Sequence, residues 1–542
     1  MAGGRCEDEG KSVTIRQPFT IYSIDDFASW REHYAYPVSC DMNVQLDKHL
    51  SATLLDLYRT VPPEARPHYR IASKPLFYEA FDLILKVLVA EGYRAQKGVE
   101  YFLDNHNIPR GAVVPERNTT FEIYQGVHNP EYRYLELQYD DRPYLRIPFR
   151  DRWRNRIGDL LKGRDPFFSS AGSVLLMLPN DCVETYVGTH GLRGVRYLRP
   201  HRIFRRRSPF EATAGLEGAF HAIAESITEA IPHLYSSLGG ETFPGAILNS
   251  VCHRIPLLLR RVEDDLQQAR AYARKLPAKS ELYTGTAKHY VRVMAEAIRE
   301  RGGRVTGFPH GGALCLYELA CLAFTEFATS DRFACFGEAD AACCRQVSTL
   351  APVEFPVFPE MGASPLAVGS CAIGRGETIR LGPDASIMYV FCNLYYDTYG
   401  MATRSDTQCL DFQLRALEFL LTLERPVLFK NRPKTATLGP AFNHFGYFAS
   451  NTRLQYMNEP FTEVLHKADL FVFEGVGGGS LYEAMTLTDK PILLFKPNAP
   501  QCSPAFEAAL EKRCHVIPLR QDERNRYVFD ASAVRQLFED GG

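Results

Sequence analysis

The feature that most constrains the fold is a regular alternation of apolar runs and amphipathic segments between residues 385 and 542. The pattern predicts strands at 387–392, 426–429, 469–473 and 490–495, and helices at 406–423, 460–467, 480–487 and 505–512. Uninterrupted apolar strands that alternate with helices form parallel sheets covered on both faces. We therefore expect a doubly wound α/β unit in the last third of the chain.

A shorter alternation of the same kind lies in the middle of the chain. After an apolar run at 173–178, the pattern predicts a strand at 281–284, a helix at 286–301 and a strand at 304–308. Gly302 and Gly303 are typical of a helix stop. The predicted domains are an N-terminal accessory region at 1–165, a first doubly wound domain at 166–380 and a second one at 381–542.

The accessory region has mixed α and β character. Its patterns predict helices at 47–59 and 75–91 and strands at 121–124 and 132–137. No motif in this region indicates a function.

The composition excludes several classes of protein. The chain has 542 residues, 45% of them hydrophobic, and a net charge of −2, so no global field favours nucleic acid or an anionic membrane. No run approaches the roughly 20 apolar residues that span a bilayer, and residues 1–10 are too polar for a signal peptide. The 14 scattered cysteines contain no Cys-x-x-Cys pair, which favours buried thiols over a closed zinc site. We therefore expect a cytoplasmic protein without a metal.

A glycine-rich loop follows the predicted strand at 469–473. The loop contains Gly477, Gly478 and Gly479, and Ser480 opens the predicted helix that carries Glu483. Glycines let backbone amides approach a ligand closely, and a helix N-terminus favours a phosphate. The loop therefore predicts a phosphate or diphosphate site, with Glu483 placed to accept from ribose hydroxyls. The alternative is a plain glycine-rich turn between a strand and a helix.

Cations and aromatic residues follow two other strands of the same predicted sheet. Lys430 and Arg432 follow the strand at 426–429, and they suit a phosphate because an arginine can bind it bidentately. Tyr395 and Tyr396 follow the strand at 387–392 and could stack on a base or a sugar. The alternatives are a solvated basic turn and aromatic side chains in a surface loop.

His310 follows the predicted strand at 304–308 and is flanked by glycines, with Glu318 further along. A histidine at this edge can act as a general base or bind a phosphate or a sugar. The alternative is a histidine that caps the following helix.

Residues 193–207 carry seven arginines, interleaved with apolar residues. Such a segment could contact anionic lipid headgroups or an anionic glycan. We take a solvated basic face as the default interpretation, and no recognised motif indicates nucleic-acid binding.

Residues 469–485 followed by 490–495 resemble the donor-binding element of GT-B glycosyltransferases. Pro309-His310-Gly311, Glu318 and residues 330–337 resemble a segment of the surface-polysaccharide members of that superfamily. These members are capsule Kdo transferases, CDP-glycerol glycerophosphotransferases and bacterial sialyltransferase-like enzymes. Residues 430–433 lie where many of them carry a histidine beside a proline, and this chain has Arg432 in that place.

The resemblance implies two Rossmann-like domains of GT-B type, with the nucleotide-sugar donor on the second and the acceptor on the first. The implied donor site contains Lys430, Arg432, Gly477–Ser480 and Glu483. His310 would be the base or a phosphate ligand, with Glu318 as a second candidate. The capsule and sialyl members favour a CMP-activated acidic sugar as donor and a surface glycan as acceptor. No Asp-x-Asp motif lies near these elements, so a metal is not expected.

Two other functions remain open at this point. A sugar-nucleotide epimerase or hydrolase of the same fold would use the same nucleotide site without an acceptor. A non-catalytic scaffold subunit of a glycan-assembly complex would keep the fold and lose the phosphate chemistry.

Overall fold

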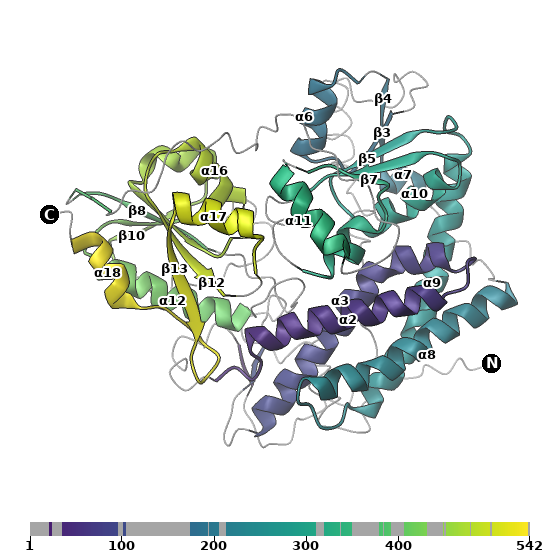
Figure 1. Cartoon of the computed structure of the whole chain (residues 1–542), viewed down its shortest axis with the longest axis horizontal. Coiled ribbons are helices and arrows are strands. Elements are labelled where there is room, and N and C mark those ends of the chain that lie inside the picture. The colour runs from purple at the N-terminus through teal and green to yellow at the C-terminus, as the bar shows by residue number, and fades with distance from the viewer. Residues whose placement is uncertain are drawn as a thin grey trace, which may run out of the picture.

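The computed structural model describes residues 21–23, 35–95, 101–103, 174–192, 194–204, 213–309, 319–335, 338–349, 379–382, 384–391, 406–430, 448, 451–476, 479–498 and 501–539. Two large, mainly parallel sheets and a layer of long helices make up most of the described part of the chain (Figure 1). The predicted α/β class with two doubly wound sheets is confirmed. The strands predicted at 121–124 and 132–137 lie outside the described residues.

The second sheet has seven strands in the spatial order β10-β9-β8-β11-β12-β13-β14. In chain order they are β8 (Ile387–Val390), β9 (Val427–Lys430), β10 (Leu454–Met457), β11 (Leu470–Glu474), β12 (Ile492–Pro497), β13 (His515–Gln521) and β14 (Tyr527–Val528). All neighbouring pairs are parallel except β13 with β14. The carboxyl ends of the first six strands therefore meet at one edge.

Helices cover both faces of this sheet, as the continuous apolar strands predict. On one face α12 (Asp406–Leu421) packs, with the Phe412 ring 5.4 Å from that of Phe495. On the other face lie α15 (Phe461–Val464), α16 (Gly479–Leu487) and α17 (Pro504–Arg513). A C-terminal helix, α18 (Ala531–Glu539), follows β14.

Strands β10 and β13 of this sheet are not continuous apolar runs, so the sequence pattern did not predict them. Strand β10 lies at the edge and is only partly buried, while β13 alternates buried and exposed residues. A strand covered on one face carries polar residues on the other, so it does not read as a continuous apolar run.

The first sheet has five parallel strands in the order β4-β3-β5-β6-β7. In chain order they are β3 (Val174–Met177), β4 (Val195–Leu198), β5 (Glu281–Thr284), β6 (Arg304–Gly307) and β7 (Arg332–Phe333). Helix α6 (Asp181–Thr189) covers one face and α10 (His289–Arg299) the other. A short π-helix, Ala323–Phe327, and α11 (Glu338–Thr349) flank β7 in the chain.

The basic segment 193–207 is part of this sheet, which the sequence did not predict. Its described residues form β4 and the short helix α7 (Pro200–Ile203). Arg196, Arg199 and Arg202 are half-buried, and the Arg196 guanidinium donates to the Tyr272 hydroxyl at 3.3 Å. These three arginines are therefore less exposed than those of a fully solvated basic face, and the default interpretation of the segment stays a prediction.

Long helices form a third layer against α10. Helices α2 (Cys40–Thr60), α3 (Arg66–Ala95), α8 (Ala214–Ser237) and α9 (Gly245–Ala273) run side by side beneath the first sheet (Figure 1). Upstream of α2, backbone and side-chain hydrogen bonds join Tyr36 to Arg524 and Asn525 in the turn after β13. The N-terminal helices thus pack on the first sheet's unit and are tied to the second. A further parallel pair joins β1 (Ile21–Ser23) to β2 (Tyr101–Leu103).

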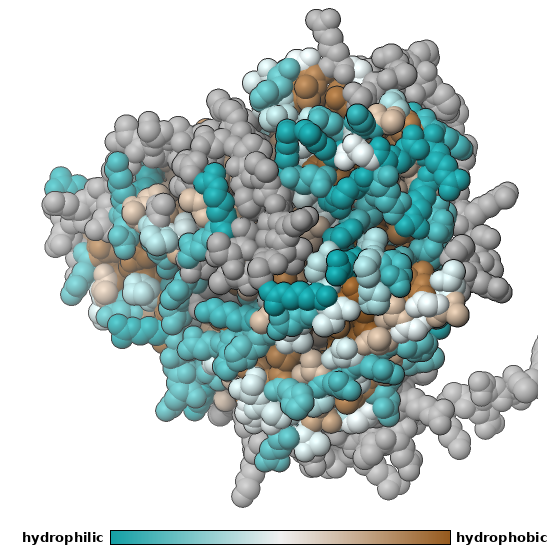
Figure 2. All heavy atoms as spheres, turned by 45° about the vertical axis from the view of Figure 1, so that its right-hand side comes forward, coloured by the Kyte–Doolittle hydropathy of each residue, from teal (hydrophilic) through white to brown (hydrophobic). Residues whose placement is uncertain are grey.

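On the face drawn in Figure 2, most of the described residues are hydrophilic, and hydrophobic residues show in patches between them. Within the described ranges, Leu257 and Leu487 are the large hydrophobic residues that are exposed. No helix in the described part of the chain is long and apolar enough to cross a membrane.

Glu79 gives the helical layer an unusual pH dependence. It lies on α3 with its carboxylate 3.6 Å from Arg254 of α9, and burial raises its pKa to about 7 against the opposing charge of Arg254. Between about pH 4.5 and 7 the folded chain therefore holds a proton that the unfolded chain has lost, so stability falls as pH rises through this window. We expect Glu79→Gln to be about 1–2 kcal/mol more stable than wild type at pH 8 and similar at pH 5.

Urea midpoints at the two pH values measure this difference. Glu225→Gln is the control, because Glu225 is exposed on α8. Equal changes of the midpoint with pH in wild type and Glu79→Gln would contradict the prediction.

Candidate functional site

The second sheet reverses its strand order between β8 and β11. Numbered along the chain from β8, its parallel strands follow the spatial order 3-2-1-4-5-6, which is the order of dinucleotide-binding sheets. In open parallel sheets, ligands bind beyond the carboxyl ends of the strands at the reversal point. Since β8 ends at Val390 and β11 ends at Glu474, the segments after these two residues border the candidate site.

The glycine-rich turn after β11 lies at this reversal point. Gly475 has a φ of 82°, which other residues rarely adopt, and its N–H donates to the Phe495 carbonyl at 2.7 Å. Helix α16 then begins at Gly479, where a Cβ atom would meet nothing within 4 Å among the described residues. As at any helix N-terminus, the first amides of α16, including that of Ser480, have no acceptor within the helix and suit an anion. Gly477 and Gly478 lie outside the described residues.

Lys430 and Glu483 lie on the same face of the sheet as this helix start. Lys430 ends β9 and is 4% exposed, and alternation along the strand places it on the face of Leu428, which packs under α16. Burial lowers the pKa of Lys430, while the charges of Glu459 and Glu483 act in the opposite direction. Burial raises the pKa of Glu483, and the charge of Lys430 opposes this. The charges of Lys430 and Glu483 thus influence each other across the face of the sheet that α16 covers.

A buried carboxylate supports the turn from the opposite face of the sheet. Glu474 is 2% exposed and accepts hydrogen bonds from the Tyr389 hydroxyl and the Gln413 amide, both at 2.7 Å. Sequence reasoning assigned no role to Glu474. The sequence does show a carboxylate at the end of an otherwise apolar strand, immediately before a glycine. Since a buried charge needs hydrogen-bond donors around it, this position could have indicated the polar contacts of Glu474.

The first sheet has its own reversal point, between β3 and β5. Its spatial order is 2-1-3-4-5 along the chain, the order of flavodoxin-like sheets. Asn180 follows β3 and donates through Nδ2 to the carbonyls of Gly285 at 3.3 Å and Pro309 at 2.8 Å. It thereby ties together the segments that follow β3, β5 and β6. A Cβ atom at Gly285 would come within 2.4 Å of the Asn180 side chain, so glycine is required there.

Asn180 was not predicted from the sequence. The sequence clue is the Pro179-Asn180-Asp181 segment after an apolar strand, because Asn is a preferred N-cap residue. In the structure the Asn180 Oδ1 does cap the next helix, where it accepts from the Val183 N–H at 3.1 Å. The predicted residues His310, Glu318, Arg432, Tyr395 and Tyr396 lie outside the described residues.

The described residues include no group of three or more His, Cys, Asp or Glu side chains arranged to hold a metal ion. The expectation that no metal is required stays a prediction.

The sequence matches no protein-family model and no curated protein. Three similar solved structures are an α,α-trehalose 6-phosphate synthase from Burkholderia multivorans, a UDP-GlcNAc 2-epimerase from Methanocaldococcus jannaschii, and a UDP-forming α,α-trehalose-phosphate synthase from Burkholderia xenovorans in complex with glucose-6-phosphate. Their identities are 11%, 9% and 13%, with TM-scores of 0.31, 0.32 and 0.27. The alignments cover 60%, 67% and 56% of this chain and 84%, 91% and 72% of the other chains. Similarity at these values identifies neither a family nor a reaction.

Proposed function

We propose that this chain is a GT-B-type glycosyltransferase that moves a sugar from a nucleotide-sugar donor to an acceptor hydroxyl. The observation that carries the proposal is the reversal point of the second sheet. The start of a helix, a buried lysine and a half-buried glutamate lie there at the carboxyl edge of a sheet with dinucleotide-binding strand order. Helix amides and a lysine suit a phosphate or a diphosphate, and a carboxylate suits ribose hydroxyls.

Each predicted residue has a role in this proposal. The amides from Gly477 to Ser480 bind the donor phosphates together with Lys430 and Arg432. Glu483 accepts from the ribose, and Tyr395 or Tyr396 stacks on the base or the sugar. The same cations and amides stabilise the charge that develops on the leaving nucleotide phosphate.

The acceptor lies against the first sheet, where His310 takes the proton of the attacking hydroxyl or binds a phosphate. Glu318 is the second candidate for this base. As the hydroxyl oxygen bonds to the anomeric carbon, the bond from that carbon to the nucleotide phosphate breaks. Closure of the two sheets around the substrates would exclude water and limit hydrolysis of the donor.

We infer the substrate class from the sequence resemblance alone. It favours a CMP-activated acidic sugar such as Kdo as the donor and a surface glycan as the acceptor, without a metal. The protein would act in the cytoplasm, and Arg193–Arg207 would provide any peripheral contact with the inner face of the membrane.

Nucleotide-dependent thermal stabilisation tests the donor site. We expect one of CMP, UMP, GMP, CDP, UDP and GDP, or a corresponding sugar nucleotide, to raise the melting temperature by about 5 °C at 100 times its Kd. Lys430→Met, Arg432→Ala and Ser480→Ala should reduce this shift. Lys512→Met is the charge-matched control, because Lys512 is exposed on α17. A folded protein that no nucleotide stabilises would contradict the proposal and favour a scaffold subunit.

Product analysis separates the transferase from its enzymatic alternative. With the stabilising sugar nucleotide, a glycosyltransferase forms a glycosidic product only when an acceptor is added. An epimerase or hydrolase converts the donor in the absence of an acceptor and forms no glycosidic product. Acceptor-independent conversion at full rate would therefore replace the transferase with that alternative.

A further inference from the structure

Two cysteines in the unit of the first sheet place their sulfur atoms next to each other. Cys335 comes two residues after Phe333, the last residue of β7, and Cys344 lies in the middle of α11, the helix that follows this strand (Figure 1). The Cys335 Sγ and the Cys344 Sγ are 3.8 Å apart, and both residues are 0% exposed. The proposed function uses neither cysteine.

The packing around the pair holds both sulfur atoms close together. The buried face of α11 contains Ala341, Cys344 and Val347, which are three residues apart. This face belongs to the same hydrophobic core as Phe333 and Cys335. Between these two residues, the Ala334 N–H donates to the Gly307 carbonyl at 2.9 Å, which fixes the chain beside β6. Both thiols therefore lie in packed segments of the structure.

The distance between the two sulfur atoms is close to that of a bonded pair. The sulfur atoms of a disulfide are about 2.0 Å apart, so each of these sulfurs has to move by about 0.9 Å. A cysteine sulfur moves this far when its side chain rotates by roughly 30° about the Cα–Cβ bond, which leaves the backbone in place. The observed contact is therefore that of a reduced pair from which a disulfide can form.

We propose that Cys335 and Cys344 form a disulfide when the protein is exposed to hydrogen peroxide. One sulfur, as its thiolate, attacks a peroxide oxygen, the O–O bond breaks, and a sulfenic acid and one water form. The other sulfur attacks the sulfenic sulfur, the S–O bond breaks, and the hydroxyl group leaves with the proton of the second thiol as another water. Each sulfur loses one electron and the peroxide gains two. A thiol reductant reverses the reaction.

The disulfide is a covalent link between the end of β7 and the middle of α11. Because both thiols are buried, peroxide reaches them only after α11 opens locally, and we expect the reaction to take hours rather than seconds. Once a sulfenic acid has formed, the second thiol is only 3.8 Å away and reacts with it before further peroxide does.

Peptide mapping of the full-length folded protein tests the pair. The protein is treated with hydrogen peroxide, and the remaining thiols are then alkylated with N-ethylmaleimide in denaturant. The tryptic peptide 333–345 contains Cys335, Cys343 and Cys344. We expect this peptide to carry one alkyl group instead of three and otherwise to be about 2 Da lighter than the reduced peptide. Cleavage after Glu338 should leave its two halves joined until a thiol reductant is added.

The adjacent cysteine supplies a matched control. Cys343→Ala should still form the link, whereas Cys335→Ala and Cys344→Ala should not. Circular dichroism shows whether each variant folds. If a variant does not, fragmentation of the wild-type peptide between residues 343 and 344 identifies the bonded sulfur directly.

Three results would overturn the proposal. One is a link from Cys335 to Cys343 in place of Cys344. Another is oxidation of the peptide to a sulfinic acid without a link between its halves. The third is full alkylation of all three cysteines after hours of exposure of the folded protein to peroxide.

Discussion

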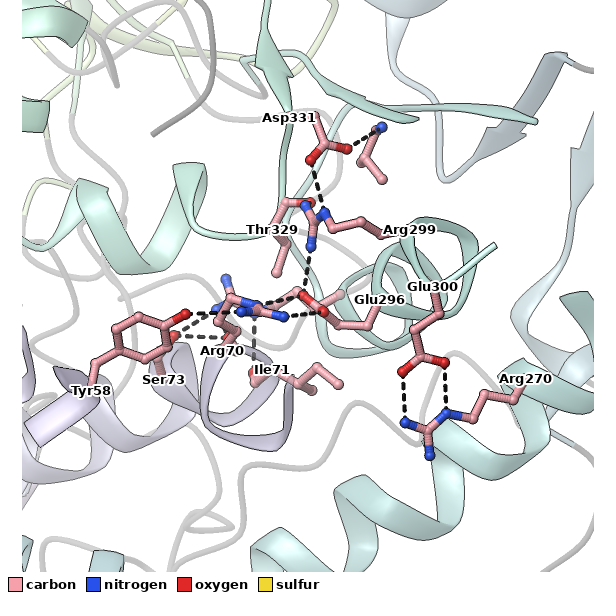
Figure 3. A network of polar contacts seen from close by, with 12 residues as sticks. Tyr58, Arg70, Ile71, Ser73, Arg270, Glu296, Arg299, Glu300, Thr329 and Asp331 are labelled. Carbon is pink, nitrogen blue, oxygen red and sulfur yellow. Dashed lines mark hydrogen bonds and ion pairs between the residues drawn. The ribbon is translucent and has the colours of Figure 1, made fainter. Parts of the chain in front are cut away.

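Glu296→Ala is expected to destabilise the protein by about 3–5 kcal/mol, because it leaves two arginines of a buried network without their shared carboxylate. Glu296 lies on α10 and is 1% exposed. Arg70 donates to it through Nε at 3.0 Å and Nη2 at 2.7 Å, and Arg299 donates at 2.7 Å (Figure 3). Burial alone would raise the pKa of Glu296, yet Arg70 and Arg299 hold it below its ordinary value.

The network extends from the N-terminal helices to the first sheet. Arg299 also donates to Asp331 at 2.8 Å, and the second oxygen of Asp331 accepts from the Val305 N–H of β6. Glu296→Ala therefore removes the ion pair between α3 and α10 and weakens the contact of α10 with β6, while the Arg292 hydrogen bonds to α3 remain.

A neighbouring residue supplies a matched control. Glu300, at the C-cap of α10, accepts from Arg270 at 2.8 and 2.6 Å, with the same chemistry (Figure 3). Its side chain is 36% exposed, so Glu300→Ala should cost about 1 kcal/mol or less. Urea unfolding followed by circular dichroism measures both variants. Equal losses of unfolding free energy in Glu296→Ala and Glu300→Ala would show that the buried Glu296 network stabilises the protein no more than an exposed ion pair does.

Arg292→Met is expected to cost about 3–5 kcal/mol, because it removes donors from several buried acceptors at once. Arg292 is 0% exposed and donates to the Ile71 carbonyl at 3.1 Å, the Phe324 carbonyl at 2.8 Å and the Ser73 hydroxyl at 2.7 Å, as well as to the Arg70 carbonyl. Proline has no N–H, so Pro75 inside α3 cannot donate the usual helix hydrogen bond to the Ile71 carbonyl four residues earlier. Arg292 donates to this carbonyl instead.

This explanation predicts a coupling between Pro75 and Arg292. Pro75→Ala restores the helix donor for Ile71, so Pro75→Ala/Arg292→Met should lose about 1 kcal/mol less than the sum of the two single variants. Strict additivity would contradict the role given to the Ile71 carbonyl. Arg304→Met, at an exposed position on β6, should change the free energy of unfolding by no more than about 0.5 kcal/mol.

The second sheet was largely predictable because its central strands are buried on both faces. Strands β8, β9, β11 and β12 were found near their observed bounds, and Lys430, Ser480 and Glu483 were selected because they follow strand ends. In the middle region, β4 was missed because it has only four residues, one of them Arg196, and further arginines flank it at 193 and 199. The N-terminal helices also begin earlier than their apolar faces predict, at Cys40 and Arg66, because packing of the long helices extends them.

The sequence by itself determined the strands that are buried on both faces and the helices between them, since these depend on local apolar periodicity and on glycine, proline and capping residues. Only the tertiary structure decided the strand orders, and with them that Lys430 faces Glu483 and that Arg199 lies beside the turn of Asn180. It also decided that Arg292 donates to the Ile71 carbonyl, to which Pro75, 217 residues before Arg292, cannot donate. These pairs join residues that are far apart in the sequence. No local sequence pattern predicts them, because the interaction stabilises the protein only when folding brings both partners together in a buried position.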